Sequence, residues 1–193
     1  VEFINHATFA TDATIEELAK HADKHWVTPA IAARYNTTYE AGDWGITTEI
    51  AETMGNKREL EAGCENMQKM HKAGIKVLPF GDYGFAWLPI GTDARDLEHM
   101  VKLFGMQPCE ALRAATAYGG EAWAGAGGEL LGRVKAAYLA DLIVVDGDPL
   151  ADISILQDIT RITAVMKDGR FHRRPAPGEP FATFGEAREQ SAA

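Results

Sequence analysis

The stretch I75-K-V-L-P-F-G-D-Y-G-F-A-W87 joins an apolar run to an aspartate, with a glycine directly before that aspartate and four aromatic residues close by. The apolar run predicts a buried strand that ends near residue 82. A carboxylate at the tip of a buried strand is unfavourable unless a cation or a proton-transfer role stabilises it there. Asp82 is therefore the first candidate for a functional residue.

Strand and helix patterns alternate on both sides of this stretch. Apolar runs predict earlier strands at residues 1–5 and 26–33, and helical periodicity predicts helices at residues 14–25, 56–74, 92–105 and 107–118. Asn56 is expected to be an N-cap, with Glu59 completing a capping box. A polar loop is predicted over residues 34–56, with a helical turn near residues 46–52.

This alternation predicts an α/β fold with parallel strands and right-handed crossovers. Three parallel strands would leave their edges and one face uncovered, whereas such sheets are normally covered on both faces. Residues 1–127 are therefore interpreted as the C-terminal portion of a (β/α)8 barrel of the TIM type, with its last three strands and helices. Further strands are predicted at residues 130–135, 140–147 and 162–173, with a hairpin turn at D168-G169.

The composition excludes several classes of partner. With 193 residues, of which 46% are hydrophobic, the chain can bury a sizeable core. The formal net charge of -9 and the lack of clustered basic residues argue against a nucleic-acid partner. No run approaches the roughly 18 consecutive apolar residues of a membrane span, so no membrane partner is expected.

The cysteines and the start of the chain bear on its location. Cys64 and Cys109 lie in predicted helices, which favours reduced thiols and a cytoplasmic protein. No signal peptide is recognisable. The sequence opens with V1-E-F-I-N-H6 and no Met, so the true N-terminus is expected to lie upstream.

His6 and Asp82 are the strongest pair of candidate site residues. In a (β/α)8 barrel the reacting groups lie at the carboxyl ends of the strands, and these two residues end the first and third predicted strands. A neutral imidazole and a carboxylate are suitable ligands for Zn²⁺ or a similar divalent ion. Structural alternatives remain open, namely a hydrogen-bonded loop histidine for His6 and a turn or helix cap for Asp82.

A series of segments resembles a known family. G81-D82 is followed by A94-R-D-L-E-H-M-V-K-L-F-G-M-Q-P-C-E-A-L-R-A-A-T116, L131-G-R-V134, L139-A-D-L-I-V-V-D-G-D-P-L150 and V165-M-K-D-G169. In this order the segments resemble the C-terminal part of the amidohydrolase superfamily, in the branch that contains imidazolonepropionases and Xaa-Pro dipeptidases. The resemblance extends over nearly the whole chain.

The resemblance implies a barrel flanked by a small β-sandwich, whose strands would come from residues 128–174. From the sequence itself, residues 175–193 are expected to form a flexible tail. It also implies that His6 binds a metal ion and that Asp82 both binds the ion and shuttles a proton. The implied reaction is hydrolysis of an amide or peptide C–N bond by metal-activated water, with zinc as the expected divalent metal.

The sequence also departs from the family pattern. The H-x-H pair, the bridging lysine or carboxylate and a further metal-binding histidine have no counterpart in it. Ala136 and Ala137 replace the usual glycine before A-D-L. The literal G-T-D of I90-G-T-D93 makes Asp93 a rival to Asp82, although Asp93 follows Pro89 and is well placed to cap the next helix.

Candidate substrate-binding residues follow the second and third predicted strands. Tyr83 and Trp87 come after Asp82, and Arg34 and Tyr35 come after the second strand. Aromatic side chains with one guanidinium suit an acyl group that bears a carboxylate, as in a small-molecule amide or a dipeptide-like substrate. Simple packing of these residues over the barrel is the alternative.

Other candidates favour structural roles. His21 and His25 flank the apolar face of one predicted helix and are expected to be solvated or at a boundary. His71 shares the apolar face of its helix and is expected to be buried, whereas His99 is expected to be exposed. By the family resemblance, Asp141 belongs to the β-sandwich and is structural.

Two hypotheses from different classes remain. In the first, the chain supplies part of the active site of a metal-dependent amidohydrolase and pairs with a complementary N-terminal barrel segment, or self-associates as a homo-oligomer, through its open sheet edges. In the second, it is a non-catalytic barrel fragment or structural subunit without a complete metal centre. The number of metal ligands distinguishes the two hypotheses.

Overall fold

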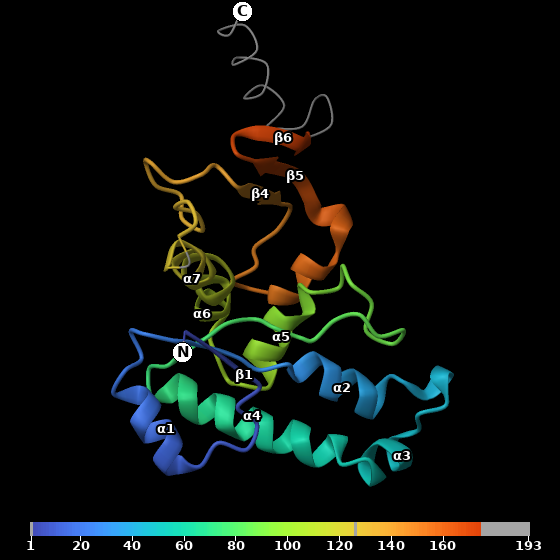
Figure 1. Ribbon diagram of the computed structural model, residues 1–193. Helices are drawn as coiled ribbons and strands as arrows, with labels where there is room; N and C mark the ends of the chain where they lie inside the picture. The colour runs from blue at the N-terminus through green and yellow to red at the C-terminus, as the bar shows by residue number, and fades with distance from the viewer. Residues whose placement is uncertain (1, 126, 175–193) are drawn as a thin grey trace, which may run out of the picture.

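A computed structural model describes residues 2–125 and 127–174 (Figure 1). A parallel sheet in the order β1-β2-β3 lies near the N-terminus, as the alternation predicted. Its strands are β1 (Phe3–Asn5), β2 (Trp26–Thr28) and β3 (Lys76–Val77). Helices α1 (Asp12–Ala19) and α5 (Arg95–Lys102) are shorter than the predictions at residues 14–25 and 92–105, whereas α4 (Asn56–Lys72) nearly fills its predicted range.

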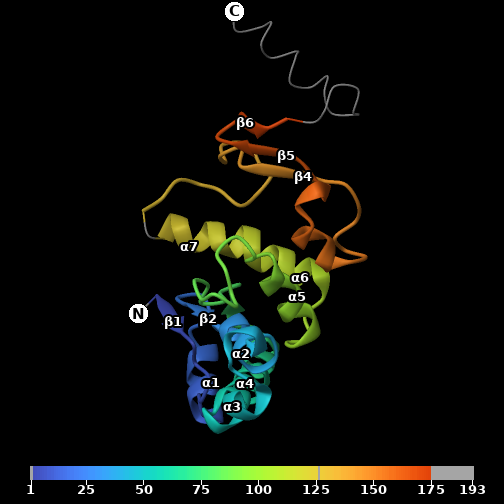
Figure 2. The same cartoon turned by 90° about the vertical axis from the view of Figure 1, so that its right-hand side faces the viewer.

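The main core lies on one face of the parallel sheet. Val27 and Val77 point from β2 and β3 into a cluster that includes Met67 and Met70 of α4 and Met100 of α5. The opposite face contacts a later helix: Trp26, Leu78 and Ala122 of α7 (Gly119–Gly125) form a second cluster. Figure 2 shows α7 crossing between the parallel sheet and the C-terminal part of the chain.

The C-terminal strands form an antiparallel sheet in the order β4-β5-β6. They are β4 (Leu142–Val145), β5 (Ile162–Lys167) and β6 (Arg170–Arg173). Asp168 and Gly169 take φ values of 49° and 73°, so the predicted hairpin turn is confirmed. Asp141 accepts hydrogen bonds from Lys167 and from the amide of Asp168, a structural role as expected.

Two 3-10 helices connect β4 to β5. They are η3 (Ile153–Gln157) and η4 (Ile159–Arg161), and η3 packs against α5. The strand predicted at residues 130–135 is wrong, because this segment makes no strand pairing. Its backbone instead packs closely on α7, at Gly120. The predicted division near residue 127 stays a prediction, and the predicted tail at residues 175–193 lies outside the described residues.

The strand predicted at residues 26–33 is also partly wrong. It ends at Thr28, and helix α2 (Ile31–Tyr39) occupies the end of the predicted strand and the start of the predicted loop. The start of α2 is buried because α4 and α5 both pack against it, so its sequence lacks an early polar face. The predicted helical turn further on is present as α3 (Thr48–Thr53), after the 3-10 turn η1 (Gly42–Trp44).

The predicted cap of α4 is wrong. Gly55, with a φ of 87°, is the N-cap, and Asn56 is the first helical residue. The buried side chain of Asn56 accepts a hydrogen bond from Arg34 instead, and Glu59 pairs with the same guanidinium. The capping-box residues therefore join α4 to α2.

The helix predicted at residues 107–118 is longer than expected. It begins at Pro108 as α6 (Pro108–Arg113), passes through a π-helical turn at Ala114–Tyr118 and continues into α7. A capping box at Gln107 and Glu110 fixes its start. Gly120 allows the helix to touch the backbone of the later segment at Leu131 and Gly132.

Two histidine predictions are wrong. His25 lies beyond α1, directly before β2, and is only 4% exposed. His99 is 5% exposed, because α5 packs on α2 and brings the ring within 4.8 Å of the Tyr35 ring. His21 is exposed as expected, and His71 is half-buried, with Nε2 3.3 Å from Glu110.

Cys64 and Cys109 are both free, and burial raises the pKa of the Cys64 thiol to about 11. Within the described ranges, each helix is too short or too polar to cross a lipid bilayer.

Gly120→Ala is expected to destabilise the protein, while Gly119→Ala in the same helical segment provides a matched control. A Cβ at residue 120 would overlap the carbonyl of Leu131, whereas a Cβ at residue 119 would have its nearest neighbour 3.9 Å away. Overpacking costs about 1–3 kcal/mol, and helical Ala gains about 0.5–1 kcal/mol over Gly. Thermal unfolding should rank Gly119→Ala above the parent and Gly120→Ala below it; the reverse order would contradict this packing.

His99→Phe is expected to remove an acid sensitivity of the fold. Burial, with a smaller contribution from Arg95, lowers the pKa of His99 to about 4. Between that value and the ordinary pKa near 6.5 the unfolded chain binds more protons, so acidification destabilises the parent. The free energy of unfolding of variant and parent should be measured with denaturant at pH 7 and at pH 4. The variant's advantage over the parent should be larger at pH 4, by about 1.4 kcal/mol for each unit by which burial lowers the pKa of His99. A difference independent of pH would contradict a buried neutral imidazole.

Candidate active site

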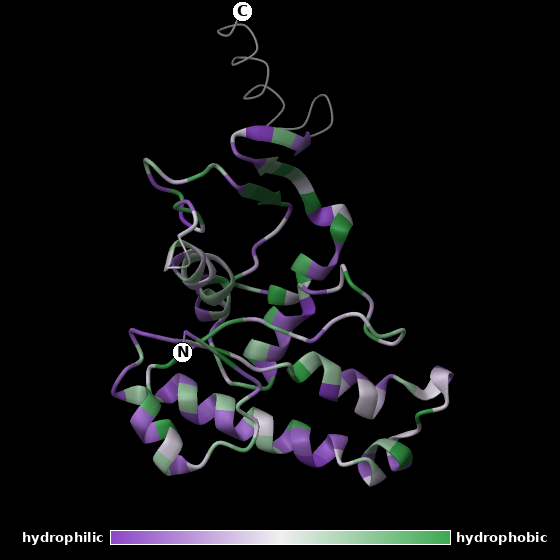
Figure 3. Ribbon diagram, viewed as in Figure 1, coloured by the Kyte–Doolittle hydropathy of each residue, from purple (hydrophilic) through white to green (hydrophobic). Residues whose placement is uncertain are grey.

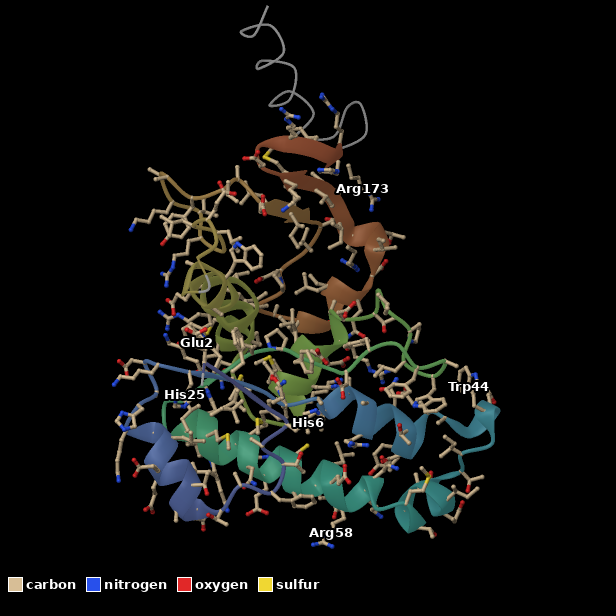
Figure 4. All side chains as sticks on the ribbon, viewed as in Figure 1. Glu2, His6, His25, Trp44, Arg58 and Arg173 are labelled. Atoms are coloured by element: carbon tan, nitrogen blue, oxygen red, sulfur yellow. The ribbon has the colours of Figure 1, made fainter. Side chains whose placement is uncertain are left out.

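His6 and Asp82 face each other at the carboxyl edge of the parallel sheet. His6 directly follows β1, and its Nε2 lies 3.8 Å from Oδ2 of Asp82. The predicted strand end near residue 82 is wrong, because β3 ends at Val77 and Asp82 lies in the loop beyond it. The two side chains are 44% and 41% exposed. Figure 4 shows His6 in the middle of the molecule, near the start of α2. The structure therefore brings together the two residues that the sequence singled out.

The backbone is strained at this edge. His6 has a φ of 68° and Asp82 a φ of 62°, both in the left-handed region that residues with a Cβ seldom adopt. Ala30, which follows β2, has a φ of 53°. Each such residue costs about 1–3 kcal/mol and persists only where its surroundings determine the conformation. Strain of this kind is typical of functional sites, and here it follows each of the three parallel strands.

Backbone pairing fixes His6. Its amide donates to the carbonyl of Thr28 at 2.7 Å, so the pairing of β1 with β2 continues one residue past the strand. The Thr28 hydroxyl also donates to the side chain of Asn5 at 2.6 Å. These contacts hold His6 to β2 on the side that faces Asp82.

Contacts of Gly81, the residue before Asp82, fix the position of Asp82. The Gly81 carbonyl accepts a hydrogen bond of 2.9 Å from the amide of Ala33 in α2. A Cβ at this residue would lie 2.8 Å from both the Ala32 Cβ and an oxygen of Asp96, and would overlap the Tyr83 ring. Glycine is therefore required here by close approach of three neighbours.

A cavity of about 540 Å³ lies beside Asp82. Its walls include Tyr83, Asp93 and Asp96 together with apolar residues such as Phe80 and Leu97. The prediction that Asp93 caps the following helix is wrong, because its carboxylate accepts a hydrogen bond from the amide of Gly91. Asp93 therefore shares the cavity with Asp82.

Asp96 is a site residue that the sequence did not reveal. It is 6% exposed, and its Oδ1 accepts a 3.0 Å hydrogen bond from the Tyr83 hydroxyl. Burial raises the pKa of Asp96 to about 7, and the pKa of Tyr83 also rises, chiefly through burial. Asp96 lies in the first turn of α5, next to Arg95, a position that is typical of a solvated carboxylate. Its burial could therefore not be read from the sequence.

The candidate substrate-binding residues are not gathered around His6 and Asp82. The Arg34 guanidinium is held by Glu59 at 2.7 Å and by Asn56, both on α4. Tyr35 packs against the rings of Tyr39 and His99. Of the four candidates, Tyr83 alone lines the cavity beside Asp82. The substrate-binding roles stay predictions.

Trp87 lies against α2 and an aromatic neighbour. Its Nε1 donates to Thr37 at 2.9 Å, and its ring lies 6.3 Å from that of Trp44. Figure 4 shows Trp44 at the far end of α2 from His6. Figure 3, coloured by hydropathy, shows apolar residues in the loop that follows β3. Trp87 therefore belongs to an aromatic surface at that end of α2.

His6 and Asp82 fit two positions of a divalent metal centre. Ligand atoms of tetrahedral zinc lie about 3.4 Å apart, from bonds of about 2.0–2.2 Å, so a separation of 3.8 Å needs only a small side-chain adjustment. Within the part of the chain that the structure describes, no group of three His, Cys, Asp or Glu side chains could hold an ion. These residues thus supply fewer than the three protein ligands usual in catalytic zinc sites.

Several proteins of known sequence are similar to this chain. Ochratoxinase of Aspergillus niger is 32% identical over 120 residues, which are 62% of this chain and 25% of ochratoxinase. The chain therefore spans about a quarter of the length of this relative.

Solved structures agree over most of the chain. The crystal structure of a putative prolidase from Bifidobacterium longum has a TM-score of 0.77 and 26% identity, and the match covers all of this chain and 47% of that one. The crystal structure of A. niger ochratoxinase has a TM-score of 0.73 and 23% identity, over 92% of this chain and 38% of that one. Coverage below half of each neighbour is consistent with a partial barrel.

The model of the Amidohydrolase family matches residues 2–171. This match includes His6 and Asp82, and also β4, β5 and the start of β6. The family resemblance noted in the sequence is confirmed: the chain belongs to the amidohydrolase family.

Proposed function

We propose that this chain supplies part of the active site of a metal-dependent hydrolase that cleaves an amide or peptide C–N bond. The observation that carries the proposal is the 3.8 Å separation of His6 Nε2 and Asp82 Oδ2 at the carboxyl edge of the parallel sheet. Family membership supports hydrolase chemistry, and the similar proteins named as an ochratoxinase and a prolidase support amide-type substrates.

The two residues have distinct roles in this proposal. His6 presents a neutral imidazole nitrogen as a ligand, and Asp82 presents a carboxylate oxygen beside it. A bound zinc or similar divalent ion would make water more acidic and polarise the scissile carbonyl group. Asp82 accepts the proton of the attacking water and donates it to the leaving nitrogen. The partial exposure of both side chains leaves room for substrate.

The position of Arg34 bears on which substrate we propose. The guanidinium of Arg34, which was expected to bind a substrate carboxylate, already pairs with Glu59. The cavity beside Asp82 offers apolar and aromatic walls instead. We therefore propose a small amide or dipeptide-like substrate whose apolar part contacts Phe80 and Tyr83.

A specific observation favours the non-catalytic alternative. The described residues supply two candidate ligands and no group of three. If the remaining ligands are not brought in by further barrel strands, His6 and Asp82 form a weak site at most. Metal content decides between the two functions.

His6→Ala and Asp82→Ala are each expected to abolish binding of zinc. Each substitution removes one of the two donors, and one remaining donor binds an aquated ion weakly. Metal analysis after dialysis against zinc, together with calorimetric titration, would measure the loss.

Two matched controls accompany these variants. His21→Ala removes an exposed histidine of α1 and should leave zinc binding unchanged. Asp93→Ala tests the rival carboxylate in the same cavity and should also retain zinc. Loss of zinc with Asp93→Ala but not with Asp82→Ala would transfer the ligand role to Asp93.

We further propose that a complementary barrel segment or a second copy of the chain covers the free edges of the parallel sheet. Within the described residues, β1 and β3 each pair on one side only. Light scattering of the purified protein is expected to give a particle larger than the 21.0 kDa of one chain. A monodisperse particle of that single-chain mass would contradict the proposal.

A further inference from the structure

We propose that the hydrogen bond from the Tyr83 hydroxyl to Asp96 is a positioning contact that holds Asp82 in the backbone conformation facing His6. The inference rests on the proposed function, because it concerns how Asp82 is presented. Neither Tyr83 nor Asp96 touches the reacting atoms in this proposal, and both act through the backbone of residues 81–83.

The conformation of Asp82 needs external support. A φ of 62° is unfavourable for aspartate, so an unsupported loop would relax to an extended or right-handed conformation. Such a change would redirect the carboxylate, which now lies 3.8 Å from His6. A supporting contact is therefore required on each side of Asp82.

The support before Asp82 comes from α2. The Ala33 amide donates to the Gly81 carbonyl at 2.9 Å, and Ala32 packs against the glycine without space for a side chain. This contact fixes the direction in which the chain enters Asp82. It does not fix the direction in which the chain leaves.

The support after Asp82 comes from α5. The Tyr83 hydroxyl donates to Asp96 Oδ1 at 3.0 Å, and Asp96 is only 6% exposed. The next residue, Leu97, and Met100 one turn later anchor α5 in the main core. Because α5 is fixed, the hydrogen bond fixes the Tyr83 ring and with it the backbone that follows Asp82.

Packing alone does not account for a carboxylate at residue 96. Burial of an acid is costly, as the raised pKa of Asp96 shows, and an apolar side chain would fill the same space without that cost. A hydrogen-bond acceptor is needed only if the hydroxyl of Tyr83 must be held. The required property is therefore the acceptor oxygen, and asparagine should provide it equally well.

Tyr83→Phe separates positioning from packing, since it removes the hydroxyl and keeps the ring. Zinc affinity of the purified protein, measured by calorimetry, should fall about 10–100-fold, the usual effect of losing a contact that orients a ligand. Exchange of the Ala33 amide, followed by NMR, should accelerate, because the Gly81 carbonyl that protects it becomes mobile. Thermal unfolding should still show one cooperative transition.

Variants at residue 96 and a matched control complete the test. Asp96→Asn should keep zinc affinity and Ala33 protection within about twofold, whereas Asp96→Ala should reproduce the effects of Tyr83→Phe. Tyr138→Phe, which lies outside the cavity and the parallel sheet, should change neither measurement. If Asp96→Asn keeps both zinc affinity and protection of the Ala33 amide, the hydrogen bond, and not the charge, is the positioning element.

The outcomes distinguish this inference from the proposed function. If the parent binds no zinc and Tyr83→Phe still accelerates exchange at Ala33, the positioning contact is upheld and the hydrolase proposal fails. If the parent binds zinc and Tyr83→Phe changes neither zinc affinity nor exchange, the positioning contact is overturned. Equal losses with Asp96→Asn and Asp96→Ala would also overturn it, because the acceptor oxygen would then not be what matters.

Discussion

Parallel hydrogen bonding between β1, β2 and β3 gives the three strands one common direction. Their carboxyl ends therefore meet at a single edge, although residues 6 and 82 are far apart in sequence. The pairing extends past β1 through the amide of His6, which donates to Thr28. Without this register, neither the imidazole nor the carboxylate would have a partner within reach, and the helices that cover the sheet would have no common core.

The sequence predicted the strands better than the segments that follow them. Ile75, Val77, Trp26 and Val27 are apolar and buried, and short runs of such residues are typical of parallel strands. The boundary between β2 and α2 was missed because Ala30, Ile31, Ala32 and Ala33 are all buried. A helix surrounded by other helices loses the polar face that distinguishes it from a strand, and only tertiary contacts reveal it.

The sequence also predicted part of the candidate site, namely His6 and Asp82, but not the residues around them. The alternation of strands and helices was enough to place His6 and Asp82 at one edge, since that follows from strand direction alone. Arg34 was expected at the start of a loop over the sheet edge, but it lies in α2, and its guanidinium pairs with Glu59 of α4. Asp96 was missed because a carboxylate in a first helical turn is ordinarily solvated, and its burial depends on Tyr83 and Gly81 from another segment.

At the left-handed residues that follow the parallel strands, the residue type that relieves backbone strain is not always the one that supplies a metal ligand. Glycine adopts a positive φ without strain, so glycine at Ala30 would relax the backbone and leave both candidate ligands in place. Glycine at His6 or Asp82 would relax it too, but would delete a donor atom. A laboratory selection for heat resistance alone would accept glycine at residues 6, 30 and 82 alike, whereas one that also demands metal retention would accept it at residue 30 but not at residues 6 and 82.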